Sequence, residues 1–261
     1  MAGSLDRDAL AAALVTRGSP WSDVEHHATI ASTNARAALL AVPWHIVVAD
    51  HQSEGRGRLA RTWEAPPGTS VAVSATLPVP PHGQGWMPLL AGLSVAEAVS
   101  SITGLATDLK WPNDVLLPDD ADRKVCGVLC EVVTGPGEDC VVVGAGINVD
   151  QDRDQLPVDS ATSLRLAGAG EIDRNRLVAA YLSALVRWYA SLTGGDEVGL
   201  RDAYRRRCGT VGQEVVLSRP QGADVLGRAV GVDDDGRLVI EGADGRRSWA
   251  AGDVTHLRSA R

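Results

Sequence analysis

The sequence predicts an α+β domain followed by a smaller all-β domain, and three observations lead to this prediction. Stretches with helical spacing alternate with short apolar strands over the first 208 residues. From Gly209 onward only short strands remain, and Asp-Gly turns at 235–236 and 244–245 separate them. The length of 261 residues, with 44% hydrophobic and 22% charged side chains, fits a globular protein of one or two domains. We therefore expect domains over residues 1–208 and 209–261.

The elements of the first domain can be assigned in order. A helix is expected over Ser32 to Ala41, where Ser and Thr can cap its start, and a strand over His45 to Ala49. Residues 50–69, here called the Arg loop, then lose all apolar periodicity, and loops of this length are uncommon in compact domains unless they are functional. The further elements are a strand over Val71 to Leu77, a helix over Trp86 to Ile102, strands over Val125 to Val133 and Val141 to Val149 with a turn at 135–137, and helices over Asp173 to Leu192 and Glu197 to Arg207.

The second domain is expected to be a small barrel or sandwich. Short strands are predicted over Glu214 to Leu217, Arg228 to Val232 and Leu238 to Glu241. Neither an internal repeat nor a flexible linker interrupts the chain, so we expect the two domains to pack together.

The composition argues against several classes of protein. A formal charge of −8 is unfavourable for a surface that binds nucleic acid, so no DNA partner is expected. The stretch MAGSLDRDAL has acids where a signal peptide needs basic residues, and residues 87–106 are typical of a buried helix, so no membrane partner is expected. The cysteines at 126, 130, 140 and 208 lack CxxC spacing, which favours core positions over redox or metal roles and indicates a reducing cytoplasm.

The Arg loop carries a concentrated positive charge. Arg56, Arg58 and Arg61 lie within six residues, and Gly55 and Gly57 are interspersed with them. Glycine lets the backbone approach a ligand closely, and arginine presents a planar fork that fits carboxylate or phosphate. The alternative is a nucleic-acid tail of the RG type, but such tails are usually repetitive and terminal, whereas this segment is single and internal. The pattern favours a small anionic ligand.

Two further segments carry residues suited to a polar site. Pro112 ends a short strand after Lys110 and leaves Asn113 and Asp114 on a turn, although an ordinary Asn-Asp turn is an equally good interpretation. Lys124 begins an apolar strand and is one of only two lysines among 25 basic residues. A cation at that position can hold phosphate, although lysine at strand ends is also common on plain surfaces.

A glycine-rich strand and a helix cap complete the candidate segments. Gly144 to Val149 (GAGINV) lacks the third glycine and the following helix of a dinucleotide-binding loop. Two glycines within a strand more often admit a ligand or another backbone. By itself, the sequence STN at 32–34 indicates only a helix cap.

Together and in this order, these segments resemble the biotin protein ligases, or biotin–[acetyl-CoA-carboxylase] ligases. The resemblance is carried by STN at 32–34, ADHQSEGRGRLARTW at 49–63, LKWPNDVLL at 109–117, RKVCGVLCEV at 123–132 and GAGINV at 144–149. These motifs cover residues 30–150 densely, and the C-terminal β segment fits the family's small SH3-like domain. The resemblance implies a biotin/lipoate ligase-like catalytic domain, which is a mixed sheet with packed helices, followed by that SH3-like domain.

The resemblance also implies a two-step reaction with biotin and ATP as substrates and Mg²⁺ as the metal. Biotin is activated as biotinyl-5′-AMP with release of pyrophosphate. The biotinyl group then passes to a lysine of a biotin carboxyl carrier protein domain, which belongs to a biotin-dependent carboxylase.

The family's functional residues can be placed on these motifs one by one. The implied biotin site comprises Ser32, Thr33, Asn34, Gln52, Gly55, Arg56, Gly57, Arg58, Lys124, Gly127 and Gly144. The implied ATP site comprises Arg58, Arg61, Trp63, Asn113, Lys124 and Asn148, and the implied catalytic residues are Lys124, Arg56, Arg58 and Asp114. Lys124 is expected to bridge the biotin carboxylate and the α-phosphate, whereas Gly127 and Gly144 leave room for biotin. Asp114 is expected to orient Mg²⁺ or the incoming lysine amine unless it only caps a turn, and no firm metal ligand is expected.

Departures from the family pattern and two alternatives remain. The family loop often continues with Arg-Gly, whereas this chain has Leu59-Ala60, which would reduce the flexibility of the loop. Only about 30 residues precede STN, too few for the winged-helix domain of the members that repress biotin genes, so no repressor function is expected. The alternatives are a lipoate–protein ligase, which shares the fold and the adenylate chemistry, and a non-catalytic biotin-binding regulator.

Overall fold

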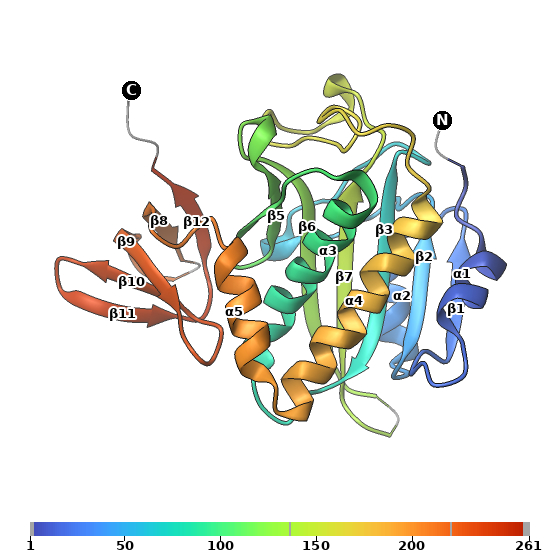
Figure 1. The fold of residues 1–261 in the computed structure, drawn as a ribbon, viewed down its shortest axis with the longest axis horizontal. Helices are drawn as coiled ribbons and strands as arrows, with labels where there is room; N and C mark the ends of the chain where they lie inside the picture. The colour runs from blue at the N-terminus through green and yellow to red at the C-terminus, as the bar shows by residue number, and fades with distance from the viewer. Residues whose placement is uncertain (1–2, 136, 220, 258–261) are drawn as a thin grey trace.

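The protein, seen in a computed structural model that describes residues 3–135, 137–219 and 221–257, forms a large mixed sheet with helices and a smaller antiparallel sheet (Figure 1). The large sheet has the strand order β1-β2-β3-β7-β6-β5-β4, in which β1 and β2 run parallel and the other neighbours antiparallel. Its strands are β1 (Asp23–His27), β2 (His45–Ala49), β3 (Ser70–Pro78), β4 (Asp108–Lys110), β5 (Asp114–Leu117), β6 (Arg123–Val133) and β7 (Cys140–Asn148). The helices are α1 (Arg7–Leu14), α2 (Thr33–Leu40), α3 (Met87–Thr103), α4 (Arg174–Gly194) and α5 (Glu197–Arg207).

The two faces of the large sheet are covered unequally. Because successive strand residues point to opposite faces, Ile46 and Val48 enter the main core while Val47 belongs to a separate small cluster. The main core lies beneath α3 and α4, which cross the front of the sheet in Figure 1. The small cluster joins Val47 and Val142 to Ala37 of α2. Among the described helices, α2 therefore packs on the opposite face, against β2, β3 and β7.

The apolar helix α3 is a core element. Together with the short turn before it, residues Gln84–Thr103 are long and apolar enough by composition to cross a membrane. However, 67% of the most apolar window is buried inside the protein, and Leu89, Leu90 and Leu93 are 0–1% exposed. This burial agrees with the buried helix expected from the sequence.

The smaller sheet follows α5 and is tied to the larger body by two tryptophans. Its order is β11-β10-β9-β8-β12, formed by β8 (Glu214–Ser218), β9 (Val225–Val232), β10 (Leu238–Gly242), β11 (Gly245–Trp249) and β12 (Asp253–His256). The Trp86 indole N–H donates to the Asp234 carbonyl at 2.9 Å, and that of Trp111 donates to the Gly236 carbonyl at 3.0 Å. Both indoles are buried, so the turn between β9 and β10 is fixed against the first sheet.

The fold class expected from the sequence is confirmed, and most expected elements lie within two residues of their observed bounds. Ser32 and Asp173 cap α2 and α4 as expected, because each side chain accepts backbone N–H groups of the first turn. Five elements were not expected from the sequence: α1, β1, β5, β11 and β12. The sequence placed Asp114 on a turn, but it begins β5. Pro136 of the expected turn at 135–137 lies outside the described residues.

Candidate active site

A cleft opens on the α2 face of the large sheet, beside the start of α2 and over parts of β6 and β7. Its volume is about 750 Å³ including the open mouth. The lining residues come from the start of α2, the Arg loop, the turn before β5, strands β6 and β7, and the small sheet. They are Ser32, Thr33, Asn34, Gln52, Arg56, Gly57, Arg58, Arg61, Thr62, Trp63, Asn113, Asp114, Lys124, Gly127, Val128, Leu129, Gly144, Ala145, Gly146 and Asp253.

Polar side chains at the start of α2 form a buried network at one end of the cleft. The backbone N–H and the hydroxyl of Thr33 lie 2.7 and 3.0 Å from Gln52 Oε1. The Ser74 hydroxyl lies 2.8 Å from Thr33 Oγ1 and 2.6 Å from Asn34 Oδ1. Ser32, Thr33 and Asn34 are at most 5% exposed. This network presents fixed hydrogen-bonding groups, which suits a small polar ligand head group.

The floor of the cleft contains glycines at positions where a larger side chain would collide with a neighbouring one. A Cβ on Gly144 would lie 2.0 Å from Asn34 Oδ1, and a Cβ on Gly146 would lie 2.4 Å from the indole of Trp63. A Cβ on Gly127 would lie 3.1 Å from the same indole. The room beside Gly144 is thus occupied by Asn34, and a ligand would share the floor with Trp63. Gly146 was not among the residues expected for the site, although the GAGINV segment contained the signal.

Lys124 and Asp114 line the cleft and form an ion pair. Lys124 Nζ lies 2.6 Å from Asp114 Oδ1, and it lies 5.8 Å from the centre of the Trp63 ring. The two residues belong to the neighbouring strands β5 and β6, in which Asp114 lies opposite Gly127 and Lys124 lies opposite Leu116. The side chains are 32% and 19% exposed, so the lysine remains accessible to a ligand in the cleft.

The Arg loop folds back on itself at the mouth of the cleft. The Trp63 N–H donates to the Gly55 carbonyl at 2.8 Å, and the Gly57 N–H donates to the Arg61 carbonyl at 2.7 Å. A Cβ on Gly55 would lie 2.3 Å from the Trp63 carbonyl, so this turn requires glycine there. The sequence provided no reason for the loop to settle without a ligand, and these contacts were not expected.

Residues of the small sheet hold the loop from the other side. Arg58 donates to Asn113 Oδ1 at 2.9 Å and to the Gly252 carbonyl at 3.2 Å, and it lies 3.6 Å from Asp253 Oδ1. Arg61 also pairs with Asp253. Burial lowers the pKa of the Arg58 guanidinium, and the neighbouring carboxylate of Asp253 opposes this change. No local pattern indicated Asp253 as a site residue, because it stands nearly 200 positions after the loop that it contacts.

Two expected site residues lie outside the lining of the cleft. Asn148 is 4% exposed; its amide donates to the Thr162 carbonyl at 2.9 Å and its carbonyl accepts from Gln151 at 2.9 Å. Gly55 is covered by Trp63, as described above. Their expected contacts with nucleotide and biotin stay predictions.

The electrostatic character of the cleft suits an anionic ligand. Among its described lining residues, Arg56, Arg58, Arg61 and Lys124 supply four cations against two carboxylates. Cations fixed around one cavity can bring two anionic groups together and stabilise charge that develops between them. No group of three or more His, Cys, Asp or Glu side chains within the described ranges is arranged to hold a metal ion.

Comparison with known proteins gives consistent matches over most of the chain. Residues 29–148 match the biotin/lipoate A/B protein ligase family, and residues 210–257 match the biotin protein ligase C terminal domain. The chain is 36% identical to the biotin–[acetyl-CoA-carboxylase] ligase of Mycobacterium tuberculosis, over 97% of this chain and 96% of that one. It is 33% identical to the ligase of the same name from Paracoccus denitrificans, over 85% and 96%. The solved structure of biotin protein ligase from Aquifex aeolicus in complex with biotin and ATP superposes with a TM-score of 0.77, at 28% identity over 92% of this chain and all of that chain.

Proposed function

The chain belongs to the biotin/lipoate A/B protein ligase family, and we propose that it is an ATP-dependent ligase that activates biotin and transfers it to a carrier protein. The observation that carries this proposal is the position of Lys124 and the loop arginines in one cleft with the polar network at the start of α2. A ligand with a polar head group and a carboxylate tail fits this arrangement. In the proposed complex the cations contact both the carboxylate of the tail and the nucleotide phosphate beside it.

In the first step an oxygen of the biotin carboxylate attacks the α-phosphorus of ATP. A bond to phosphorus forms, the bond from the α-phosphorus to the bridging oxygen breaks, and pyrophosphate leaves. Lys124 lies between the two anions and reduces their repulsion, while Arg56 and Arg58 cover the adenylate. Ser32, Thr33, Asn34 and Gln52 bind the head group of biotin, and Asn113, Arg61 and Trp63 contact the nucleotide.

Mg²⁺ would be bound together with the phosphates of ATP. This ion usually keeps several waters and binds through one or two carboxylates together with substrate phosphates. Asp114 would hold it, since this carboxylate faces the cleft, and the ion would neutralise phosphate charge. Asp114 is paired with Lys124 at 2.6 Å, so a bound ion would share this carboxylate with the lysine.

In the second step a lysine amine of the carrier attacks the acyl carbon of biotinyl-AMP. An amide bond forms, the bond from the acyl carbon to the phosphate oxygen breaks, and AMP leaves. The attacking amine must lose a proton, and Asp114 is the acceptor or the orienting group for the lysine in this proposal. The carrier is the biotin carboxyl carrier protein domain of a biotin-dependent carboxylase, and acetyl-CoA carboxylase is the enzyme in the names of the relatives.

The proposal extends to the organisation of the chain. Residues 1–208 form the catalytic domain, and residues 209–261 form a second domain that holds the Arg loop through Asp253. We place the reaction in the cytoplasm, where ATP is available and free cysteines stay reduced. A lipoate–protein ligase is the alternative within the family.

The transfer step can be tested directly. The protein is incubated with biotin, ATP, Mg²⁺ and a purified carrier domain, and the carrier is examined by mass spectrometry. One added biotinyl group, on one lysine, is the expected result. A carrier with that lysine replaced by arginine is the control. An unmodified carrier, in the presence of measurable adenylate formation, would overturn the transfer proposal.

A further inference from the structure

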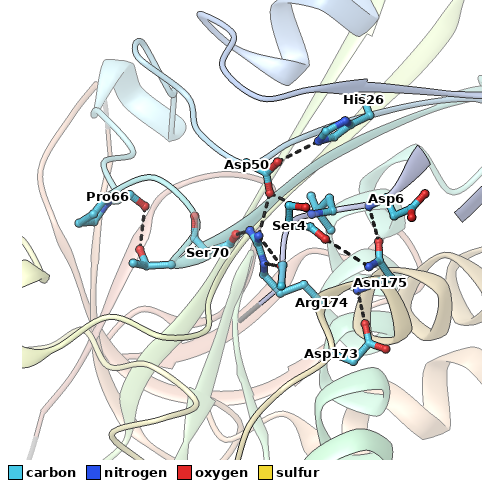
Figure 2. Close-up of polar contacts among 12 residues, drawn as sticks. Ser4, Asp6, His26, Asp50, Pro66, Ser70, Asp173, Arg174 and Asn175 are labelled. Atoms are coloured by element: carbon cyan, nitrogen blue, oxygen red, sulfur yellow. Dashed lines mark hydrogen bonds and ion pairs between the residues drawn. The ribbon is translucent and has the colours of Figure 1, made fainter. Parts of the chain in front are cut away.

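A buried ion pair between Arg174 and Asp50 lies where the Arg loop leaves the large sheet (Figure 2). Only 1% of the Arg174 side chain is exposed, and its Nη2 lies 2.8 Å from Asp50 Oδ1. Nη1 donates to the Ser70 carbonyl at 3.0 Å, while Nε and Nη2 donate to the Gly3 carbonyl at 3.0 and 2.7 Å. Asp50 Oδ1 also accepts the Leu5 N–H at 3.0 Å.

This charge would be unfavourable without its partners. Arg174 is the first residue of α4, and the N-terminus of a helix carries a partial positive charge. Burial alone raises the pKa of the Asp50 carboxyl, but the Leu5 N–H, His26 and Arg174 together hold that pKa below its ordinary value. Well-packed apolar residues often stabilise a core as well as a buried ion pair does. Stability alone therefore does not account for this ion pair, whereas the positions of the groups that it joins can.

The acceptors of Arg174 mark the two ends of the Arg loop. Asp50 follows the last residue of β2, and Ser70 is the first residue of β3. The Gly68 N–H also donates to the Asp50 carbonyl at 3.0 Å. One guanidinium thus connects the residue that opens the loop to the residue that follows it. Every contribution of the loop to the cleft comes from the chain between these two points.

Both ends lie close in sequence to residues of the cleft. Gln52, two positions after Asp50, accepts hydrogen bonds from Thr33 at 2.7 and 3.0 Å. Ser74, on the same strand as Ser70, lies 2.8 Å from the hydroxyl of Thr33. Neither Arg174 nor Asp50 lines the cleft. Any influence of the ion pair on a ligand must therefore pass through the loop ends.

We propose that Arg174 is a positioning residue for adenylate formation: by tying Asp50 to Ser70 it fixes the ends of the Arg loop, and so presents Gln52 and the loop arginines to the ligand. This inference rests on the proposed function. Because Arg174 stays away from the reacting atoms, its loss weakens ligand binding and loop closure more than the chemical step.

The test uses Arg174→Lys, which keeps the positive charge. A single ammonium cannot reproduce the forked contacts to Asp50, Ser70 and Gly3. In biotin-dependent ATP–pyrophosphate exchange, we expect the KM for biotin to rise about tenfold, equivalent to the loss of one charge-assisted hydrogen bond. The kcat should stay within about twofold of the wild-type value, since the reacting groups are intact. Trypsin should cleave the Arg loop faster than in the wild-type protein, both without ligands and with saturating biotin and MgATP.

Leu185→Ala is the matched control. Leu185 lies about three turns further along α4 and is fully buried, so this variant loses stability through a cavity without removing a contact to the loop. Assays at a temperature where both variants are folded separate positioning from general destabilisation. The proposal is overturned if Arg174→Lys changes neither KM nor cleavage, or if Leu185→Ala changes both as much.

A second variant and a measurement without ligand cover the two cases in which the first test gives no answer. If Arg174→Lys does not fold, Asp50→Asn provides the same readouts, because it keeps an oxygen acceptor but removes the negative charge. If the wild-type protein shows no biotin-dependent exchange, the proposed function fails, whereas the cleavage rates without ligand still decide whether Arg174 fixes the loop ends.

Discussion

Lys124→Ala removes the cation on which the proposed adenylation step depends most. In the structure Lys124 Nζ lies 2.6 Å from Asp114 Oδ1 and close to the face of Trp63. The variant therefore has two consequences: the reacting anions lose their common cation, and the carboxylate of Asp114 loses its partner.

The distances give the scale of each effect. At 2.6 Å and an effective dielectric constant of about 20, the attraction within the pair is roughly 6 kcal/mol before desolvation is subtracted. Because Lys124 is 32% exposed and Asp114 is 19% exposed, solvent screening reduces the net contribution to about 1–3 kcal/mol. A cation positioned at developing phosphoryl charge contributes about 3 kcal/mol, so its loss should slow adenylation about a hundredfold.

The assay is biotin-dependent exchange of pyrophosphate into ATP, with kcat/KM measured for three variants. Lys124→Ala should fall about a hundredfold. Lys124→Arg should recover only part of this loss, because a guanidinium is planar and bulky and Gly127 and Trp63 confine the site. In the double variant Lys124→Ala with Asp114→Asn, the unpaired carboxylate is gone, so any activity that returns measures its repulsion of the substrates. Near wild-type exchange by Lys124→Ala would refute the role of the lysine, and full recovery in the double variant would reassign the loss to Asp114.

Three further predictions concern Asp114 and the Arg loop. Asp114→Asn should slow single-turnover transfer from preformed adenylate more than it slows adenylate formation, since an amide cannot accept a proton from the lysine amine; an unchanged transfer rate would make Asp114 structural. Trypsin should cleave the free protein after Arg56, Arg58 or Arg61, and biotin with MgATP should protect these bonds. This protection should be weaker in Arg58→Gly. Equal cleavage rates with and without ligands would mean that the loop is not a lid. Asp253→Asn should speed cleavage roughly two- to tenfold, because exposed and half-buried ion pairs contribute about 0.5–1.4 kcal/mol, and an unchanged rate would show that the small sheet does not hold the loop.

Local patterns made most of the large domain predictable. The strands β2 and β7 could be predicted from their apolar runs. The helices α2 and α4 could be predicted from their helical spacing and from the capping residues at their starts. The strand β1 was missed because its sequence DVEHH is polar, although parallel pairing with β2 places it in the sheet. Tertiary context overrides local propensity at such positions.

The site was predictable only where its residues form continuous motifs. The residues of STN, the Arg loop and the segment around Lys124 are adjacent in sequence, and the cleft brings them together. Asp253 was missed because its contact with Arg58 joins two distant parts of the chain. The ion pair of Arg174 with Asp50 was missed for the same reason, since a lone arginine at a helix start gives no local signal.

The most direct test of the central claim is ATP–pyrophosphate exchange by the wild-type protein with biotin or lipoate as the acid. The measurement needs no carrier protein and reports only on the step that the cleft is proposed to catalyse. Biotin should support exchange in the presence of Mg²⁺, and lipoate at the same concentration should not. Exchange with lipoate but not with biotin would contradict the substrate assignment, and exchange with neither acid would contradict the proposed activity.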